Sequence, residues 1–511
     1  MNLTKLTILE ARKLLDKREI SSVELTQSTI DRIKKIDPVI GAFISFDEDL
    51  ALKQAQKADQ LISSGSSYPL TGIPFQLKDN MCTTEIPTTC ASKILKNFIP
   101  PYNATVTNKI YDQGAVLVGK GNLDEFAMGS STENSAIKQT KNPWDFNLVP
   151  GGSSGGGAAA VAAGECMFAL GSDTGGSIRQ PAAFCGIVGL KPTYGLVSRY
   201  GLIAFASSLD QIGPLTRTVA DNALVLEAIA GNDPHDATSI TTNYLTNYLD
   251  SINEDLSEIQ VGIPIEYWEQ NIEPKFKSSL KTVIETLKDI GVTLKEISLP
   301  LTEQALPVYY LIANSEASSN LSRYDGIKYG YVASDAKDIW ETIENTKGEG
   351  FGPEVKRRIL LGTYALSTGF FDQYYLKAQK VRTLIIEEFK QTFDTCDVII
   401  APTSPSVAFP IGSKITNPLD MYMNDIFTQP ANIAGIPAIS IPGGFHNNLP
   451  FGIQFIGNYL SEKTLFKLAN AYEKASSFTL TNNIINETCL LYTSDAADEG
   501  LGVDLGGRRI I

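Results

Sequence analysis

The sequence predicts an α/β fold in which a mixed, twisted β-sheet is sandwiched between α-helices. Short apolar runs of strand length alternate with segments of helical periodicity along most of the chain. Glycine-rich turns separate many of these segments, most densely between residues 142 and 217. Of the 511 residues, 43% are hydrophobic and 20% are charged, which suits a globular protein with a large buried core.

The N-terminal part predicts three helices followed by alternating elements. Ile8, Leu14 and Leu15 lie at roughly helical spacing in the first helix. Ser21 and Glu24 form a capping box ahead of the second, and residues 48–63 have the pattern of the third. We then expect a strand within residues 72–79 that ends at Lys78, followed by a helix at 106–113. A strand at 115–118 and a short helix at 122–128 are expected next.

The C-terminal half repeats this alternation. We expect strands at residues 259–263, 397–401, 438–441 and 452–456, and helices at 276–290, 307–321, 355–366, 374–393 and 463–475. Neither an internal repeat nor an interdomain linker is evident, so residues 1–487 are expected to form a single domain. The polar, turn-rich stretch 231–256 is expected to be a surface excursion.

Charge and cysteine content narrow the class of protein. The 43 basic and 57 acidic residues give a net charge of -14, which argues against nucleic-acid binding by this chain alone. A complex in which a partner binds the nucleic acid stays open. Six scattered cysteines without a CxxC pair indicate free thiols in a reducing compartment and no metal site. Because neither a signal peptide nor an apolar run of about 18 residues is found, we expect a cytoplasmic protein that does not span a membrane.

Two glycine-rich loops carry the strongest chemical signal. The first, GGSSGGG at residues 151–157, leads into a run of alanines, which favours the start of a packed helix over a flexible linker. No G-K-[ST] follows it, which excludes a P-loop. The second, GSDTGGSIRQPA at residues 171–182, places glycines ahead of Ser177, where backbone N–H groups can converge on an oxyanion. An ordinary glycine-rich turn is the alternative interpretation of this loop.

A serine nucleophile in the second loop needs a base. The two histidines, His235 and His446, lie in polar loops and are expected to face solvent, which disfavours a Ser-His-Asp triad. The remaining option is a lysine whose pKa is lowered by burial. Lys78 is the candidate because it ends a mostly apolar run beside a turn, and the alternative is an ordinary surface lysine at a strand end.

The loops and the Lys78 strand together resemble the amidase signature family. The matching motifs are GIPxxxKD at residues 72–79, GGSSGG at 151–156 and GSDTGGSIRxPA at 171–182, and the resemblance extends over roughly residues 4–485. It implies the amidase-signature fold and a Ser-Ser-Lys triad. In that triad Ser177 is the nucleophile, Ser153 is a bridging serine held by a cis peptide bond, and Lys78 is the terminal base.

The same resemblance implies roles for the residues around Ser177. The backbone N–H groups expected to bind the oxyanion are those of Thr174, Gly175, Gly176 and Ser177. Asp173 and Arg179 are expected to support the loop, with a purely structural ion pair as the equal alternative.

Further stretches are similar to one branch of the family, the A subunits of glutamyl-tRNA(Gln) amidotransferases. They lie at residues 124–134, 314–330, 354–362 and 421–425. The resemblance implies glutamine as substrate, with its carboxylate held by Arg358, its ammonium by Asp425, and Tyr309 and Ser130 assisting. The alternatives are a surface arginine for Arg358, a helix-cap aspartate for Asp425, and the adjacent Tyr310 in place of Tyr309.

This branch also implies partners. The chain would release ammonia within a heterotrimer with subunits B and C, and the tRNA would be bound mainly through a partner. No cofactor is expected in this chain, while ATP and Mg would be used by the partner that amidates Glu-tRNA(Gln). The rival functions are a stand-alone amidase acting on another small amide and a catalytically inactive scaffold. Residues 488–511 do not resemble the family and are expected to be a non-native or disordered tail.

Overall fold

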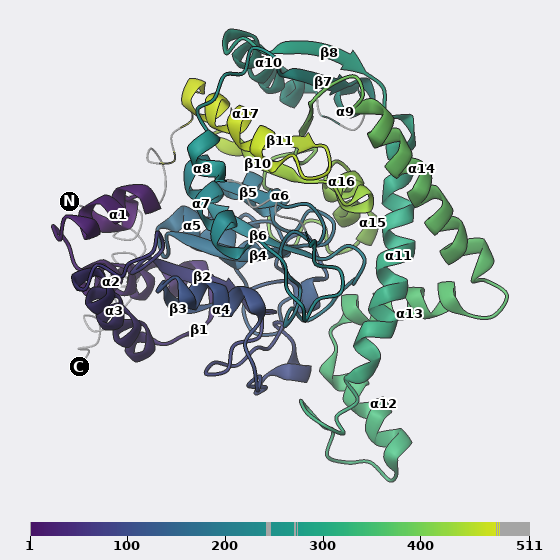
Figure 1. The fold of residues 1–511 in the computed structure, drawn as a ribbon. Helices are drawn as coiled ribbons and strands as arrows, with labels where there is room; N and C mark the ends of the chain where they lie inside the picture. The colour runs from purple at the N-terminus through teal and green to yellow at the C-terminus, as the bar shows by residue number, and fades with distance from the viewer. Residues whose placement is uncertain are drawn as a thin grey trace, which may run out of the picture.

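The protein is described by a computed structural model that covers residues 2–241, 247–269, 272, 274–476, 478 and 480. Within these residues, eleven strands form one sheet (Figure 1). Their spatial order is β1 (Phe43–Phe46), β3 (Val116–Gly121), β2 (Pro74–Lys78), β4 (Phe168–Asp173), β6 (Gln211–Thr216), β5 (Val188–Lys191), β10 (Ala438–His446), β11 (Leu449–Gly457), β9 (Val398–Pro402), β7 (Gln260–Pro264) and β8 (Thr293–Ile297).

The sheet is mixed, as predicted. β2 runs parallel to both of its neighbours, β3 and β4, and β7 runs parallel to β8 and β9. The strands between these groups, from β4 to β9, pair in antiparallel fashion. The parallel arrangement of β2 and β4 is the feature that positions the functional site, because it brings their carboxyl ends to one edge of the sheet.

Helices cover both faces of the sheet. Side chains alternate between the two faces of a strand, and in β4 Phe168 and Leu170 join one core cluster while Ala169 joins another. The first cluster includes apolar residues of α7 (Val219–Ile229) and α17 (Glu462–Ala475). The second includes those of α2 (Ser22–Ile40) and α5 (Gly155–Ala163), whose glycines and alanines allow close packing on the sheet.

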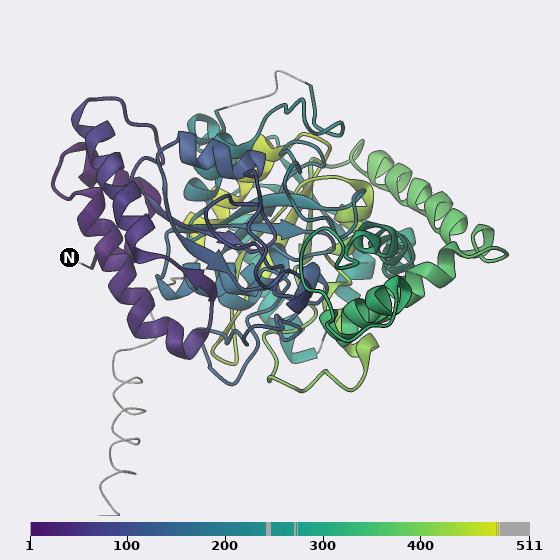
Figure 2. The same cartoon turned by 90° about the horizontal axis from the view of Figure 1, so that it is seen from below.

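A helical layer extends from the body beside the C-terminal half of the sheet (Figures 1 and 2). It consists of α11 (Ala305–Asn320), α12 (Ile339–Gly350), α13 (Pro353–Leu366) and α14 (Lys377–Thr392). The other helices are α1 (Ile8–Asp16), α3 (Glu48–Ser63), α4 (Thr105–Asp112), α6 (Arg179–Cys185), α8 (Tyr248–Ser251), α9 (Ile265–Glu269), α10 (Pro274–Asp289), α15 (Pro418–Tyr422) and α16 (Gln429–Ala434). None of the helices in the described ranges is both long and apolar enough to cross a membrane.

Most predicted elements are confirmed, and the expected short helix at 122–128 is largely wrong. Only a single 3₁₀ turn forms there, at Glu125–Ala127, and Phe126 has a positive φ of 50°. The reason is that the backbone makes tertiary hydrogen bonds instead: Phe126 N donates to the carbonyl of Cys90. Among the elements that the sequence prediction also missed are β1, β8, α7 and α12.

Two further expectations need correction. His446 is only partly exposed, because its ring packs edge-on against Phe276 and lies 3.0 Å from the Ser279 hydroxyl. The stretch 231–256 is not wholly a surface excursion, since buried Asp233 accepts hydrogen bonds from the hydroxyls of Thr105 and Ser198. His235 is exposed as expected, with 65% of its side chain accessible. Cys489 and the predicted tail lie outside the described residues.

Candidate active site

The three predicted segments meet at the carboxyl ends of β2 and β4. β2 ends at Lys78, and β4 ends at Asp173, just ahead of the Ser177 loop. The GGSS loop, which precedes α5, lies against both segments. Lys78 Nζ is 2.8 Å from Ser153 Oγ, and the next backbone N–H, of Ser154, donates to the Ser177 carbonyl at 3.1 Å. The structure therefore places Lys78, Ser153 and Ser177 in one cluster.

Lys78 is buried, with 2% of its surface exposed, so the alternative of a surface lysine is wrong. Its Nζ lies within 3.2 Å of four oxygen atoms, namely Ser153 Oγ, Ser154 Oγ, and both Oγ and the carbonyl O of Ser172. Burial lowers the pKa of Lys78 to about 7, against the opposing effects of nearby carboxylates of which Asp124 is the strongest. A neutral amine at neutral pH can accept a proton, as a general base must.

Ser153 follows a cis peptide bond between Gly152 and Ser153, as the family resemblance implied. The side chain of Ser153 is fully buried. Gly152 N donates to Gln180 Oε1 at 3.0 Å, so the turn is held by α6 as well as by α5. Ser177 is the more accessible serine, with 8% of its surface exposed, which suits a residue that must meet a substrate.

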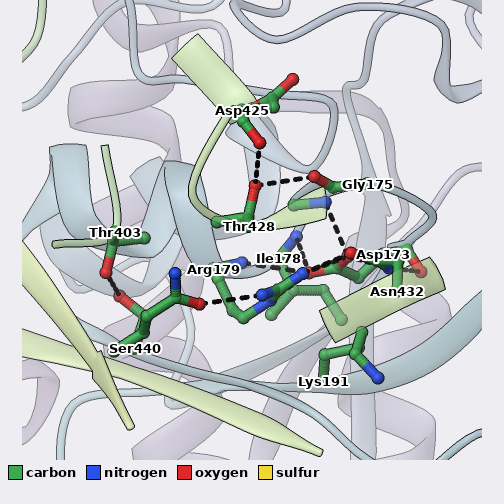
Figure 3. A network of polar contacts seen from close by, with 12 residues as sticks. Asp173, Gly175, Ile178, Arg179, Lys191, Thr403, Asp425, Thr428, Asn432 and Ser440 are labelled. Atoms are coloured by element: carbon green, nitrogen blue, oxygen red, sulfur yellow. Dashed lines mark hydrogen bonds and ion pairs between the residues drawn. The ribbon is translucent and has the colours of Figure 1, made fainter. Parts of the chain in front are cut away.

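Asp173 and Arg179 hold the Ser177 loop in shape (Figure 3). Both side chains are fully buried, and Arg179 Nε lies 3.0 Å from Asp173 Oδ2. Asp173 also accepts hydrogen bonds from Gly176 N at 2.7 Å and Ile178 N at 3.2 Å. Burial raises the pKa of Asp173, but Arg179 and the Asn432 amide outweigh it and lower that pKa to about 2. The Asp173–Arg179 pair is therefore both a buried ion pair and the support of the Ser177 loop, so the two interpretations of these residues agree.

This geometry revises one detail of the expected oxyanion site. Gly176 N–H is already committed to Asp173 Oδ1, so we assign it to loop support. The backbone N–H groups of Thr174, Gly175 and Ser177 remain the proposed oxyanion donors. Gly176 has a φ of +140°, and a Cβ there would lie 2.2 Å from Thr428 Oγ1, so only glycine fits this position.

Arg358 lies inside the protein and not on the helix surface, which removes the alternative interpretation. It is 2% exposed, and its Nε donates to Glu354 Oε1 at 2.7 Å within α13. The guanidinium lies over the rings of Phe205, Tyr310 and Tyr422, with centroids 5.3 to 5.5 Å away. Although burial lowers the pKa of Arg358, these tyrosines and Glu354 raise it overall, so the residue is a permanent cation.

Asp425 provides the opposite charge. It is buried in the 3₁₀ turn after α15, and its Oδ2 accepts a hydrogen bond from the Ser130 hydroxyl. Its Oδ1 is buried without a hydrogen-bond partner among the described residues. Burial raises the pKa of Asp425 to about 7, because desolvation outweighs the Ser130 hydrogen bond. An unpartnered buried carboxylate oxygen is unfavourable unless a ligand satisfies it.

Tyr309, and not Tyr310, faces the Ser177 loop. A Cβ on Gly175 would lie 2.6 Å from the Tyr309 ring, whereas Tyr310 stacks on Tyr422 at 4.0 Å and lines the Arg358 site. The Thr428 hydroxyl donates to the Gly175 carbonyl, which ties the Asp425 segment to the same loop (Figure 3). The predicted binding residues therefore surround the loop that carries Ser177.

Sequence reasoning missed several residues of this cluster. They are Ser154 and Ser172 around Lys78, Asp124, Glu354 beside Arg358, and Thr428 and Asn432 beside the Ser177 loop. Ser154 and Ser172 could have been found, because they lie inside the two glycine-rich motifs. Thr428 and Asn432 had no such signal, since they are about 250 residues away in sequence. No cluster of potential metal ligands occurs in the described part of the chain.

Comparisons with known proteins agree with this geometry. A family profile described as Amidase matches residues 24–466. The A subunit of the glutamyl-tRNA(Gln) amidotransferase from Thermoanaerobacter pseudethanolicus is 55% identical over 478 residues, which cover 94% of this chain and 98% of that relative. The crystal structure of the protein of the same name from Thermotoga maritima has a TM-score of 0.79 at 43% identity, covering 95% of this chain and 98% of that one.

The fold itself is shared more widely. The peptide amidase of Stenotrophomonas maltophilia also has a TM-score of 0.79, at 30% identity, with 92% of this chain and 96% of that chain covered. The expected amidase-signature fold is thereby confirmed. Because the two TM-scores are equal, it is the sequence identity, 43% against 30%, that distinguishes the amidotransferase subunit from the peptide amidase. The chain belongs to the amidase family, in the branch formed by the A subunits of glutamyl-tRNA(Gln) amidotransferases.

Proposed function

We propose that the chain is the glutaminase subunit of a tRNA-dependent amidotransferase and that Ser177, Ser153 and Lys78 form its catalytic triad. The observation that carries the proposal is the buried Lys78 Nζ, 2.8 Å from Ser153 Oγ, beside the loop that presents Ser177. The high identity to proteins named for glutamyl-tRNA(Gln) amidotransferase selects the substrate and the pathway.

The proposed reaction has two halves. Ser177 Oγ attacks the side-chain amide carbon of glutamine, and its proton passes through Ser153 to Lys78. The resulting oxyanion is stabilised by the backbone N–H groups of Thr174, Gly175 and Ser177. The C–N bond then breaks, and the proton returns from Lys78 to the departing nitrogen, which leaves as ammonia. Water attacks the acyl-enzyme in the same way, and glutamate is released with Ser177 regenerated.

Charge selects glutamine from other amides in this proposal. Free glutamine carries one carboxylate and one ammonium at neutral pH, and the site offers Arg358 and Asp425. Arg358 binds the carboxylate, while the unpartnered Asp425 Oδ1 accepts the ammonium. Tyr309 and Ser130 position these groups. A stand-alone amidase for simple aliphatic amides would have no use for two buried opposite charges at this position.

The ammonia is passed to a partner in this proposal. Subunits B and C complete a heterotrimer, in which a partner uses ATP and Mg to activate Glu-tRNA(Gln) and binds most of the tRNA. This division of labour fits the net charge of -14, which is unsuited to phosphate binding by this chain. No cofactor is assigned to the chain itself.

The test is ammonia release from glutamine by the purified chain, with and without copurified partners, ATP and Glu-tRNA(Gln). We expect glutamine hydrolysis by the complex and amide transfer to tRNA when ATP is present. Rapid hydrolysis of simple aliphatic amides by a chain that copurifies with no partner would instead establish a stand-alone amidase. Failure to hydrolyse any amide would favour the inactive scaffold.

A further inference from the structure

We infer that Asp124 is a positioning residue of the triad: its carboxylate holds the Gly152–Ser153 turn beside Lys78 and supplies the buried negative charge that offsets Lys78 when it carries a proton. The inference deepens the proposed function and rests on it, because it assigns a role in proton transfer. Asp124 lies outside the three motifs of the family, and no step of the proposed reaction uses it.

The Asp124 side chain is locked in one orientation. It is fully buried, and two backbone N–H groups donate to it, from Thr132 at 2.8 Å to Oδ2 and from Asn134 at 3.1 Å to Oδ1. The neighbouring chain also packs closely against it. A Cβ on Gly129 would lie 2.3 Å from Asp124 Cγ, so this glycine is packed directly against the carboxyl group.

The carboxylate lies against the turn that carries Ser153. A Cβ on Gly152 would be 2.2 Å from Asp124 Oδ2, and the backbone N–H of Asp124 donates to the Ser153 carbonyl at 3.3 Å. Thr132, which Asp124 orients through its backbone, donates its hydroxyl to the Gly151 carbonyl at 2.7 Å. Asp124 and Lys78 therefore contact the same short turn. Asp124 does so through its own backbone N–H, and Lys78 does so through the Ser153 hydroxyl.

The other charged groups near Lys78 are less suited to this task. Asp173, Asp210 and Cys90 also act on Lys78. Asp173 is neutralised by Arg179 at 3.0 Å, and Asp210 accepts three hydrogen bonds, from the Thr174 hydroxyl and the backbone N–H groups of Phe205 and Ala206, whereas Asp124 accepts two. Cys90 is a fully buried thiol whose pKa is raised well above its usual value by burial, so it carries no charge at neutral pH. Of the groups that raise the pKa of Lys78, Asp124 has the largest effect.

Asp124 itself faces one acidic neighbour. Burial raises its pKa to about 6, and Glu133 adds to this, while the N–H groups of Asn134 and Thr132 and the charge of Lys78 oppose it. Above that pH the carboxylate is ionised. When Ser177 loses its proton to Lys78 through Ser153, the new ammonium is then stabilised by the electrostatic attraction of a buried anion, which makes the transfer less costly.

The test compares Asp124 with a second aspartate that is also fully buried and accepts two backbone N–H groups. Asp221, in the first turn of α7, is fully buried, accepts the backbone N–H groups of Ile8 and Leu9 at the start of α1, and also has its pKa raised to about 6 by burial. Asp124→Asn and Asp221→Asn therefore remove the same charge and leave the same kind of donors facing an amide. Asp124→Ser is made alongside, because serine is smaller and fits if the asparagine amide prevents folding.

Two readouts are measured in the complex with its partner subunits across pH 5 to 9. The first is kcat for glutamine. The second is the rate at which phenylmethylsulfonyl fluoride inactivates the protein. In that reaction the Ser177 Oγ–sulfur bond forms, the sulfur–fluorine bond breaks, fluoride leaves, and the serine proton passes through Ser153 to Lys78. It reports the same proton transfer without requiring glutamine recognition.

We expect removal of the Asp124 charge to move the acidic limb of both pH profiles down by about 1 pH unit, because Lys78 loses a stabilising anion. The maximal rate should fall by about tenfold, because Lys78 becomes a weaker base. Asp221→Asn should leave the position of the limb unchanged. A uniform loss in the Asp124 variants without a shift of the limb, or an equal shift in Asp221→Asn, would overturn the inference.

The inference and the proposed function can fail separately. One outcome is that the wild-type complex does not hydrolyse glutamine while the pH profile of inactivation still differs between the wild type and the Asp124 variants. In that case the proposed substrate is wrong and the role of Asp124 stands. If wild-type hydrolysis is normal and neither profile shifts, the role of Asp124 is wrong and the proposed function stands.

Discussion

Lys78 Nζ lies 2.8 Å from the Ser153 hydroxyl, and both side chains are buried. Burial lowers the pKa of Lys78 to about 7, so near neutral pH a large fraction of this amine is unprotonated. Its lone pair can then accept a hydrogen bond from Ser153, which leaves the Ser153 oxygen free to accept the proton of Ser177. One buried contact thus sets the direction of proton transfer.

The first prediction concerns pH. Because the base form of Lys78 is the active form, kcat for glutamine should rise as pH increases through about 7. Lys78→Met should abolish the activity, since methionine cannot accept a proton. The measurement is steady-state ammonia release as a function of pH.

The control for this prediction is Lys191→Met. Lys191 is also buried with its pKa lowered to about 7, but its Nζ donates to the Pro192 carbonyl at 2.9 Å and to neither triad serine. Lys191→Met should keep the acidic limb of the wild-type profile. A limb that disappears in Lys191→Met and persists in a Lys78 variant would exclude Lys78 as the base.

The second prediction concerns the glutamine carboxylate. Arg358→Ala should raise KM by about 30-fold or more, because it removes a charge-assisted pair worth about 2 kcal/mol or more in a buried site. Arg357→Ala is the matched control: it is the preceding residue, its side chain is 43% exposed, and it pairs with the same Glu354. An unchanged KM in Arg358→Ala, or an equal rise in both variants, would remove Arg358 from the binding site.

The third prediction concerns the glutamine ammonium. Burial raises the pKa of Asp425 to about 7, and only the ionised carboxylate attracts a cation, so KM should fall as pH rises through that value. Asp425→Asn should raise KM at pH 8 and flatten its pH dependence while kcat still responds to Lys78. Asp420→Asn, in the exposed α15 turn, should leave KM as it is. A pH-dependent KM that survives in Asp425→Asn would contradict this assignment.

The fourth prediction concerns the shape of the Ser177 loop. Gly176→Ala combines a positive φ of +140° with a Cβ that would lie 2.2 Å from Thr428 Oγ1, so it should lower the free energy of unfolding by about 2 kcal/mol or more and suppress kcat. Gly291→Ala shares a positive φ, of +86°, but its Cβ would meet nothing within 4 Å. Urea denaturation should show a cost of about 1 kcal/mol or less there, with kcat retained. Equal costs at both positions would mean that the Thr428 contact has no part in loop stability.

The sequence predicts the central fold well because local patterns carry it. The third helix, residues 48–63, has the predicted bounds, and β2 ends at Lys78 as expected. The predicted helix at 122–128 fails because its backbone bonds to Cys90 and Ser153, which are distant in sequence. β8 was missed because only one of its five residues, Ile297, is buried, so the strand shows no apolar run.

In the candidate site, too, some residues can be predicted from local sequence patterns and others cannot. The two serine loops can be recognised from their glycine patterns, since a backbone that must present N–H groups restricts the residues that fit. The burial of Arg358 cannot be read from α13, where it follows another arginine, because the rings that enclose it come from three separate segments. The partner of Arg179, Asn432, is likewise supplied by a helix 253 residues away.

The most direct test of the account is the glutaminase activity of Ser177→Ala. The substitution removes only the hydroxyl of a residue that is 8% exposed, so the circular dichroism spectrum and copurification with partner subunits should match the wild type. Ammonia release from glutamine should fall by about 10³-fold or more, because no acyl-enzyme can form. Ammonia release at the wild-type rate from this folded variant would show that Ser177 is not the nucleophile.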